Sequence, residues 1–262
     1  MKIVSWNINS IRIRFPLIQR AIDTLKPDVL CLQETKVING LFPTQEAKAL
    51  GFDHVHFHGQ KSYNGVAILS KVPLKPHETY DILENGEARH ISAELPDGTL
   101  IHNFYVPAGG DEPDPTINPK FKDKLAFMDK LHEWSSSLSK QDKVVMLGDM
   151  NIAPGEHDVW SHKQLLKIVS HTPIEIEKME RLQASAGWID SARYFTPAEE
   201  KLYSWWSYRN RDWRKSNRGR RLDHIWVTPA LKGRLKSYKT LEDTRDWEKT
   251  SDHVPIMLEL AS

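Results

Sequence analysis

The stretch Lys143-Val-Val-Met-Leu-Gly-Asp149 is an apolar run that ends in a carboxylate, and Asp28-Val-Leu-Cys-Leu-Gln-Glu34 repeats this construction earlier in the chain. Short continuous apolar runs of this length are typical of buried strands. If two halves of the chain are built alike, Glu34 and Asp149 lie at one rim of a sheet-based core. The alternative is chance, because buried strands often end in polar residues, and the two runs alone favour neither.

Further apolar runs suited to buried strands alternate with candidate amphipathic helices. The additional strand candidates are Lys2–Trp6, Val66–Leu69, Ile101–Tyr105, Leu222–Val227 and Val254–Leu260. The helix candidates are Phe15–Leu25, Phe121–Leu138 and Glu175–Ala186, with Pro16 suited to a first turn and Gly187 to a helix stop. Asp97-Gly98 indicates a hairpin, and Pro107–Pro119 a functional loop. This pattern predicts two packed β-sheets with outer helices in one domain over residues 1–262.

Composition is that of an ordinary globular protein, with 39% hydrophobic and 27% charged residues. No stretch approaches the roughly 18 uninterrupted apolar residues of a membrane span, and the N-terminus lacks the features of a secretion signal. The lone cysteine, Cys31, cannot form an internal disulfide, which favours a reducing compartment. We therefore expect a cytoplasmic protein without a membrane partner. We also expect the protein to be a monomer.

Positive charge is concentrated in residues 201–239, which carry an excess of ten positive charges although the whole chain has a net charge of only +1. Trp205, Trp206, Tyr208 and Trp213 interleave with the basic residues. Such a mixture can neutralise phosphates and stack on bases or sugars, and Arg209 and Arg218 are candidate contacts to a DNA backbone. The alternative is a solvated loop whose aromatic side chains pack on the core.

Polar side chains recur at the ends of the expected strands. They are Asn7, Asn9, Glu34, Asp149, Asn151, Asp223, Asp252 and His253. Phosphodiester hydrolysis needs a neutralised phosphate, an activated water and a stabilised leaving oxygen. The carboxylates of Glu34 and Asp252, with the amide oxygen of Asn7, suit Mg²⁺, and a histidine braced by a carboxylate can contact phosphate or move a proton. A zinc cluster of several cysteines is excluded by the single Cys.

Each of these signals is weak alone. Glu34 by itself is more often an acid at a loop edge than a ligand. An Asp-His pair such as Asp252-His253 is common in turns, and Asn7 and Asn9 could simply cap the helix that follows.

The combination of segments resembles the exonuclease III family of abasic-site endonucleases, within the wider endonuclease/exonuclease/phosphatase fold. The resemblance covers essentially the whole chain, with its segments in family order. They are Ser5-Trp-Asn-Ile-Asn-Ser10, Leu32-Gln-Glu-Thr-Lys36, Asn64-Gly-Val-Ala-Ile-Leu-Ser70, Asn103-Phe-Tyr-Val-Pro107, Leu147-Gly-Asp-Met-Asn151, Tyr203-Ser-Trp-Trp206, Arg221-Leu-Asp223 and Ser251-Asp-His253. The implied fold is an α/β (α+β) four-layer sandwich, with two mixed β-sheets packed face to face and helices on the outside.

The resemblance also implies roles for individual residues. Glu34 matches the main ligand of Mg²⁺, for which Mn²⁺ could substitute, and Asn7 and Asp252 match residues close to the metal. Asp149 matches the residue that activates water. The remaining matches are Asn151 as a phosphate contact, Tyr105 as a phenol near the leaving group, Asp223 and His253 as a carboxylate–imidazole pair, and Trp205 and Leu222 as walls of the pocket for a base-less sugar. Which member is the general base stays open.

The implied activity is a DNA-repair hydrolase that incises double-stranded DNA 5′ to abasic sites and processes 3′ ends. The alternatives are a phosphatase or phospholipase of the same fold, and a DNA-binding module without catalysis. The sequence departs from the family pattern at Asn9, where some members carry Asp, and at Ala108, which replaces a polar residue. It departs again at Arg220, where well-known members have an apolar pocket residue, and in the acidic stretch Asp111–Asp114. These departures concern substrate preference rather than hydrolytic chemistry.

Overall fold

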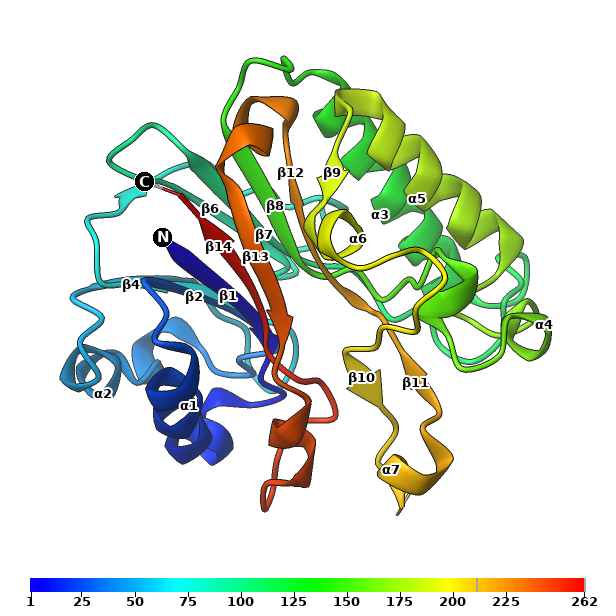
Figure 1. Ribbon diagram of the computed structural model, residues 1–262, viewed down its shortest axis with the longest axis horizontal. Helices are drawn as coiled ribbons and strands as arrows, with labels where there is room; N and C mark the ends of the chain where they lie inside the picture. Colours follow the sequence, from blue (N-terminus) through cyan, green and yellow to red (C-terminus); the bar gives the residue numbers. More distant parts are fainter. Residues whose placement is uncertain (211, 262) are drawn as a thin grey trace.

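Two six-stranded sheets stack at the centre of the structure, a computed structural model that describes residues 1–210 and 212–261 (Figure 1). The first sheet has the order β13-β14-β1-β2-β4-β3 and the second β5-β6-β7-β8-β12-β9. The strands of the first are β1 (Lys2–Asn7), β2 (Val29–Gln33), β3 (His54–His58), β4 (Val66–Ser70), β13 (Leu235–Thr240) and β14 (Ile256–Leu260). Those of the second are β5 (Lys75–Pro76), β6 (His90–Glu94), β7 (Leu100–Tyr105), β8 (Val144–Asp149), β9 (Ile189–Asp190) and β12 (Asp223–Val227).

The two sheets follow one plan. Each contains a central parallel pair, β1 with β2 and β7 with β8, and every other neighbouring pair is antiparallel. Counted along the sheets, β1 corresponds to β8 and β2 to β7. The predicted likeness of two halves is therefore confirmed, but the runs ending in Glu34 and Asp149 occupy different positions in that plan.

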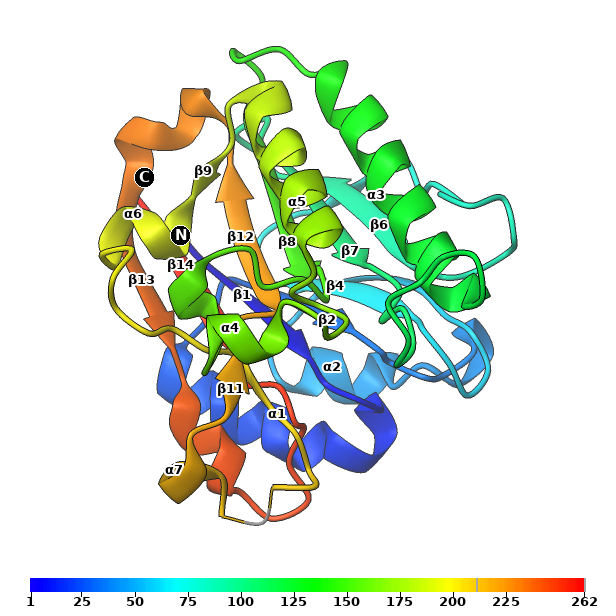
Figure 2. The same ribbon diagram turned by 90° about the vertical axis from the view of Figure 1, so that its right-hand side faces the viewer.

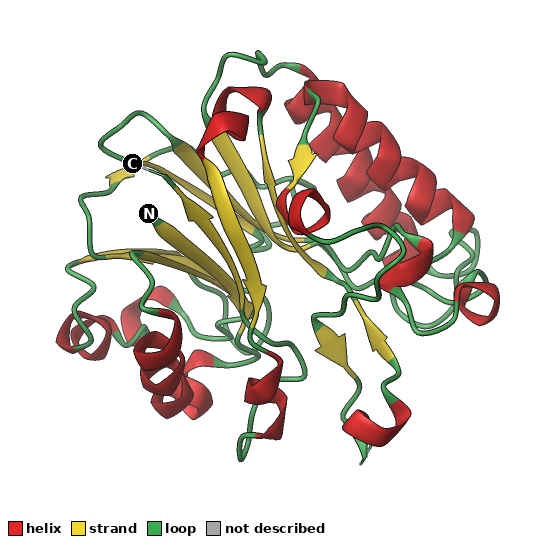
Figure 3. Cartoon of the chain, viewed as in Figure 1, coloured by secondary structure: helices red, strands yellow, loops and turns green. Residues whose placement is uncertain are grey.

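Helices cover the outer face of each sheet, which gives the predicted four-layer sandwich (Figure 3). They are α1 (Ile11–Leu25) and α2 (Thr44–Ala49) on the first sheet, and α3 (Pro119–Ser136) and α5 (Pro173–Ala186) on the second, where the latter two lie side by side (Figure 2). Because side chains alternate along a strand, Ile3 faces the core between the sheets while Val4 packs with α1. Val145 and Met146 divide in the same way on β8.

The remaining elements are short and lie outside the two sheets. A two-stranded ribbon, β10 (Trp205–Trp206) and β11 (Gly219–Arg220), projects away from the sheets and carries α7 (Trp213–Ser216) at its tip (Figure 1). The other short elements are η1 (Asn39–Leu41), η2 (Glu156–Asp158), α4 (His162–Leu165), α6 (Ser191–Phe195), η3 (Pro229–Arg234) and η4 (Glu242–Asp246). Across residues 1–210 and 212–261, the helices are too short or too polar to cross a membrane.

The predicted elements form with shifted boundaries. Gly187 ends α5 in the left-handed conformation with φ 69°, and Gly98 lies in the turn between β6 and β7, as predicted. The placement of Pro16 in a first turn is wrong. Because Ile11 is buried against the first sheet, α1 begins there and holds Pro16 in its interior, where the proline ring removes one backbone hydrogen bond.

Candidate active site

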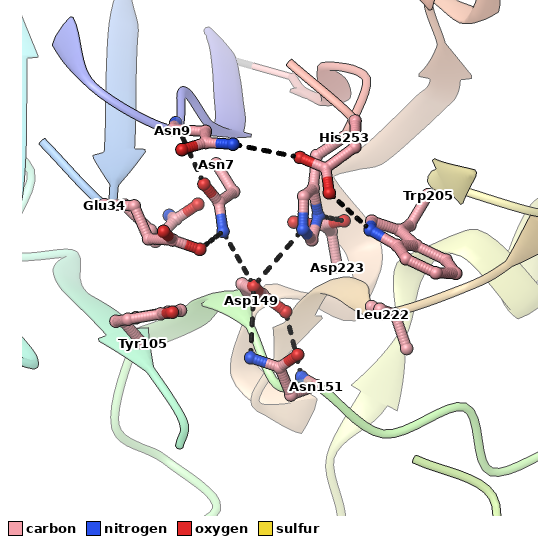
Figure 4. Close-up of polar contacts among 12 residues, drawn as sticks. Asn7, Asn9, Glu34, Tyr105, Asp149, Asn151, Trp205, Leu222, Asp223 and His253 are labelled. Carbon is pink, nitrogen blue, oxygen red and sulfur yellow. Dashed lines mark hydrogen bonds and ion pairs between the residues drawn. The ribbon is translucent and has the colours of Figure 1, made fainter. Parts of the chain in front are cut away.

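The candidate residues meet at one edge of the stacked sheets, where both parallel pairs end (Figure 4). The antiparallel neighbours β12 and β14 start at this same edge. The residues brought together there are Asn7 at the end of β1, Glu34 after β2, Tyr105 at the end of β7, Asp149 at the end of β8, Asp223 at the start of β12, and His253 just before β14. This common edge explains why residues far apart in sequence converge.

Tight backbone turns follow these strands. Glu34 and Asn151 adopt left-handed conformations with φ 51° and 52°, although neither is glycine. Such conformations are unfavourable for most side chains and cluster at functional sites. Gly148 faces Phe104 across the β7–β8 pairing, and a Cβ at Gly148 would collide with the backbone carbonyl of Phe104. The glycine of the Leu147–Asn151 segment therefore permits the close strand approach that places Asp149.

Asn7 joins two carboxylates. Its Nδ2 donates to Glu34 Oε1 at 2.7 Å and to Asp149 Oδ2 at 2.8 Å, while its Oδ1 accepts from the backbone N–H of Asn9 at 3.1 Å. The sequence predicts the amide oxygen of Asn7 as a metal ligand, and that role stays a prediction. In the arrangement seen here the amide nitrogen lies between the two carboxylates and donates to both.

His253 lies between two carboxylates. Its Nδ1 is 2.8 Å from Asp223 Oδ2, and its Nε2 is 3.6 Å from Asp149 Oδ2. Burial alone would lower the pKa of His253, but the charges of Asp223 and Asp149 outweigh burial and raise the pKa to about 10. Burial raises the pKa of Asp149, opposed by the His253 charge. The imidazole is thus a cation at neutral pH.

Asn151 and Tyr105 complete the polar wall. The Asn151 backbone N–H and Nδ2 both donate to Asp149, at 2.9 and 3.2 Å, and Nδ2 also donates to Val106 O at 2.9 Å. Burial raises the pKa of Tyr105 well above its ordinary value, with Glu34 and Asp149 adding to the rise. Its neutral phenol can therefore donate a proton or a hydrogen bond.

The donor set fits a divalent ion of hard character. The carboxylate oxygens of Glu34 and Asp149 lie within 4.8 Å of each other, and the cationic His253 beside them has no free ring nitrogen for a metal. Carboxylate oxygens are the ligands that Mg²⁺ prefers. The ammonium of Lys36, 2.8 Å from Glu34 Oε2, shares the negative charge of the cluster. The pKa of Glu34 stays below its ordinary value, because Lys36 and Asn7 outweigh the effect of burial.

Asp252 occupies a neighbouring position rather than the centre of this cluster. Its Oδ2 accepts from Trp205 Nε1 at 2.9 Å and its Oδ1 from Asn9 Nδ2 at 3.3 Å. Both carboxylate oxygens of Asp252 thus have partners, and Asn9 lies between Asp252 and Asn7. Glu34 belongs to the group of possible ligands that the geometry assembles, and the metal-ligand roles of Asn7 and Asp252 stay predictions.

A cavity of about 760 Å³ opens beside the polar cluster and includes part of it. Trp205 and Leu222 line the cavity, as do Arg209, Arg218 and Arg220. The predicted pocket walls and the predicted DNA-contacting arginines therefore share one space with the catalytic candidates.

Much of the positive charge in residues 201–239 is neutralised. Arg214 pairs with Asp243 and Asp246, Arg234 with Asp97, and Lys236 with Glu259. Arg221 is buried between Asp158 and Asp190, both 2.7 Å away. Arg211 lies outside the described residues. The charge directed at the cavity therefore comes from Arg209, Arg218 and Arg220.

The tryptophan residues of the same segment fall into two groups, one buried in the core and one lining the cavity. Trp206 and Trp213 are buried in one cluster, as the alternative interpretation of the segment expects, whereas Trp205 lines the cavity. The sequence interpretation assigned no role to Lys36 or Ser204. Ser204 Oγ donates to Asp223 Oδ2 at 2.7 Å and orients that carboxylate. Lys36 belongs to the Leu32–Lys36 segment and Ser204 to the Tyr203–Trp206 segment of the family pattern, and this membership could have identified both.

Comparison with known proteins gives a consistent assignment. The model of the Endonuclease/Exonuclease/phosphatase family matches residues 4–253. The chain is 34% identical to "Exodeoxyribonuclease III" of Haemophilus influenzae over 99% of both chains, and 32% identical to "DNA repair nuclease APEX1" of Danio rerio over 100% of this chain and 82% of the relative. An AP endonuclease structure from Archaeoglobus fulgidus superposes over 100% of both chains with a TM-score of 0.92 at 31% identity. A 3′ phosphatase from Neisseria bound to a product DNA hairpin superposes over 100% of both chains with a TM-score of 0.90 at 32% identity.

Proposed function

The chain belongs to the endonuclease/exonuclease/phosphatase family, and from this premise we propose that its site hydrolyses DNA phosphodiester bonds beside abasic sites and at 3′ ends. The enzyme is a DNA-repair nuclease, in keeping with its full-length similarity to exodeoxyribonuclease III and to abasic-site endonucleases. One observation carries the catalytic assignment. The carboxylate of Asp149 lies at the centre of the site, within reach of Asn7, Asn151 and His253.

The roles of His253 and Asp149 in proton transfer follow from their positions, since the two side chains face each other. His253 is held as a cation by Asp223, so it is a donor to a phosphate oxygen and not a base. Asp149 is buried, and burial makes its carboxylate a better proton acceptor than an exposed aspartate. Asp149 therefore takes the proton of the attacking water.

The other polar residues hold the phosphate and the leaving group. Asn151 is held by its bonds to Asp149 and Val106, which supports the proposal that it contacts the phosphate. Tyr105 is protonated and lies at the end of β7 on the same edge, where its phenol can donate to the leaving 3′ oxygen. Asp223 acts through His253 and is a positioning residue.

We propose Mg²⁺ as the cofactor, with Mn²⁺ as a substitute. Glu34 and Asp149 would hold it, and Asp252 and Asn7 would orient the surrounding waters and carboxylates. When bound, the ion supplies neutralisation of the phosphate charge and stabilisation of the leaving oxygen.

The test offers one labelled abasic duplex and its undamaged twin, each with and without Mg²⁺, and identifies the product ends. We expect Mg²⁺-dependent incision 5′ to the abasic site, leaving a 3′-hydroxyl and a 5′-deoxyribose phosphate. Asp149→Asn protein is the control for a contaminating nuclease. Equal cleavage of both duplexes would instead establish a general nuclease without preference for damage.

Three further assignments rest on sequence and are proposals. The single buried thiol of Cys31 is compatible with a reducing, cytoplasmic setting. The continuous core between the two sheets supports a single domain over residues 1–262. We also propose that the enzyme acts as a monomer on double-stranded DNA, and sedimentation with and without duplex would test this.

A further inference from the structure

Arg220 covers one wall of the cavity. It pairs with Trp205 across the β10–β11 ribbon, and its guanidinium carbon lies 5.3 Å from the centre of the Trp205 ring. Its Nη1 donates to Val169 O at 3.0 Å and to Ser170 Oγ at 2.8 Å. These contacts tie the guanidinium both to Trp205 and to residues 168–170, which form another wall of the cavity.

The wall that holds Arg220 is itself rigidly fixed. Ser170 has φ 89°, and its backbone N–H donates to both carboxylate oxygens of Glu175 at 2.9 Å. Glu175 is paired with Lys124 at 2.5 Å, and both side chains are completely buried. Lys124 also donates to the backbone oxygens of Ala108 and Asn151, so the same ion pair fixes two further parts of the cavity. The backbone to which Arg220 is bound is therefore held in place by buried hydrogen bonds and a buried ion pair.

This position has a consequence for what the cavity can hold. Trp205 and Leu222 are the surfaces on which an uncharged base-less sugar would pack, and the guanidinium of Arg220 occupies the face of Trp205. A guanidinium that covers the Trp205 ring leaves less apolar surface for such a sugar to pack on. A phosphate monoester carries nearly two negative charges at neutral pH, about one more than a phosphodiester, and gains most from added positive charge.

One donor of the Arg220 guanidinium is not used. Its Nε is buried and has no hydrogen-bond partner among the described residues. Buried donors of this kind are rare and call for an explanation, and a functional site is a frequent one.

We propose, resting on the function proposed above, that Arg220 is a specificity-determining residue which makes the pocket favour DNA ends bearing a 3′-phosphate over internal abasic sites. Arg220 acts in two ways, by covering the Trp205 face and by adding charge to the cavity that the terminal phosphate enters.

The experiment compares kcat/KM for two substrates in Mg²⁺: a nicked duplex with a 3′-phosphate, and a duplex with one internal abasic analogue. The wild-type enzyme should favour the 3′-phosphate, and Arg220→Leu should shift the ratio toward the abasic duplex by about tenfold, the usual effect of one partly desolvated cation. Arg218→Leu is the matched control, because it removes the same charge from the same cavity but lies over Trp160 instead of Trp205. It should weaken both reactions and shift their ratio less than Arg220→Leu does, because the Trp205 face stays covered.

The outcomes are distinct. A ratio that Arg220→Leu leaves within about twofold of wild type, or a wild-type preference for the abasic duplex, overturns the inference. Failure of the wild-type enzyme to hydrolyse either duplex would instead contradict the proposed function. Should Arg220→Leu melt early, Arg220→Lys gives the same comparison, because lysine keeps the charge but not the planar group, and the abasic rate should still rise.

Discussion

His253 Nδ1 lies 2.8 Å from Asp223 Oδ2, and this bond joins the two sheets, since His253 precedes β14 in one and Asp223 begins β12 in the other. Ser204 holds the same carboxylate oxygen, and its Oγ accepts from the backbone N–H groups of Leu222 and Asp223. The imidazole therefore has a fixed orientation, with Nε2 toward Asp149. Packing of the two sheets against each other is what assembles the catalytic edge.

The first prediction concerns this bond. Asp223→Asn removes the main charge that raises the pKa of His253 to about 10, so the pKa of the imidazole should fall. A cationic His253 is required by the proposed mechanism, so activity should be lost on the alkaline side at lower pH than in wild type. At neutral pH we expect a loss of about a hundredfold. The measurement is the pH dependence of kcat, and an alkaline limb that does not move would refute the cationic role.

The second prediction separates Asp149 from Glu34. Asp149→Asn keeps the shape but removes the proton acceptor, and Glu34→Gln removes a charged ligand. Each should lower turnover by about a hundredfold or more. Raised Mg²⁺ should partly restore Glu34→Gln and leave Asp149→Asn inactive, as measured by initial rates across a Mg²⁺ titration. Near-full activity of Asp149→Asn would show that another group activates water.

The third prediction distinguishes two roles for Asn7. As a ligand through its oxygen, Asn7 would tolerate aspartate, which binds Mg²⁺ more strongly. As the donor between Glu34 and Asp149, it would not, because Asn7→Asp replaces two hydrogen bonds by repulsion among three carboxylates. We expect turnover to fall by at least about tenfold and high Mg²⁺ not to restore it fully. Wild-type activity with tighter Mg²⁺ binding would support the ligand role instead.

The sequence predicts the strands that are buried on both faces, because their apolar runs are continuous. Among the strands of five or six residues, it does not reveal β3, β6 and β13. The segment His54–His58 alternates polar and apolar residues at the edge of a sheet, and Leu235–Thr240 is partly exposed at the opposite edge, so neither forms a long apolar run. The segment His90–Glu94 is largely buried but contains His90 and Ser92, whose polar atoms bond to His102 and to Glu78 O outside the strand.

The sequence predicts which residues form the site better than it predicts how their side chains are oriented. Residue type and position after a strand identify Glu34, Asp149 and His253. Which atom of Asn7 faces the site depends on two carboxylates from different strands, and that arrangement exists only in the folded chain. Charge counts mislead for the same reason. Arg221 belongs to the basic segment, yet tertiary contacts bury it against two aspartates.

The fourth prediction tests the arginines of the cavity. Replacing Arg209 and Arg218 together by Ala should reduce the slope of log affinity against log salt by about one to two units if both contact phosphates. Thermal stability should change little, because both side chains are exposed. Lys236→Ala is the control, since Lys236 pairs with Glu259 and lies away from the cavity. An unchanged slope in the double variant would mean that these arginines face only solvent.

The last prediction concerns stability at acid pH. Burial, together with nearby positive groups, lowers the pKa of His90, of His102 to about 3, and of His224 to about 4. His90 and His102 also contact each other, with 3.1 Å between Nε2 and Nδ1. The three side chains are neutral in the folded protein but bind protons near pH 6.5 once unfolded. Their contribution is therefore complete above that pH and is lost as pH falls toward the folded values.

At pH 5.5 each such histidine should lower the free energy of unfolding by about 1.4 kcal/mol, or about 4 kcal/mol for all three. Urea unfolding at pH 8 and pH 5.5 measures the difference. His102→Gln removes one titrating group while its amide can still accept from His90, so the loss on acidification should be smaller than in wild type by about 1.4 kcal/mol. The control is His132→Gln on the partly exposed face of α3, which should leave the loss unchanged. Equal losses in His102→Gln and wild type would show that His102 accepts a proton in the folded state.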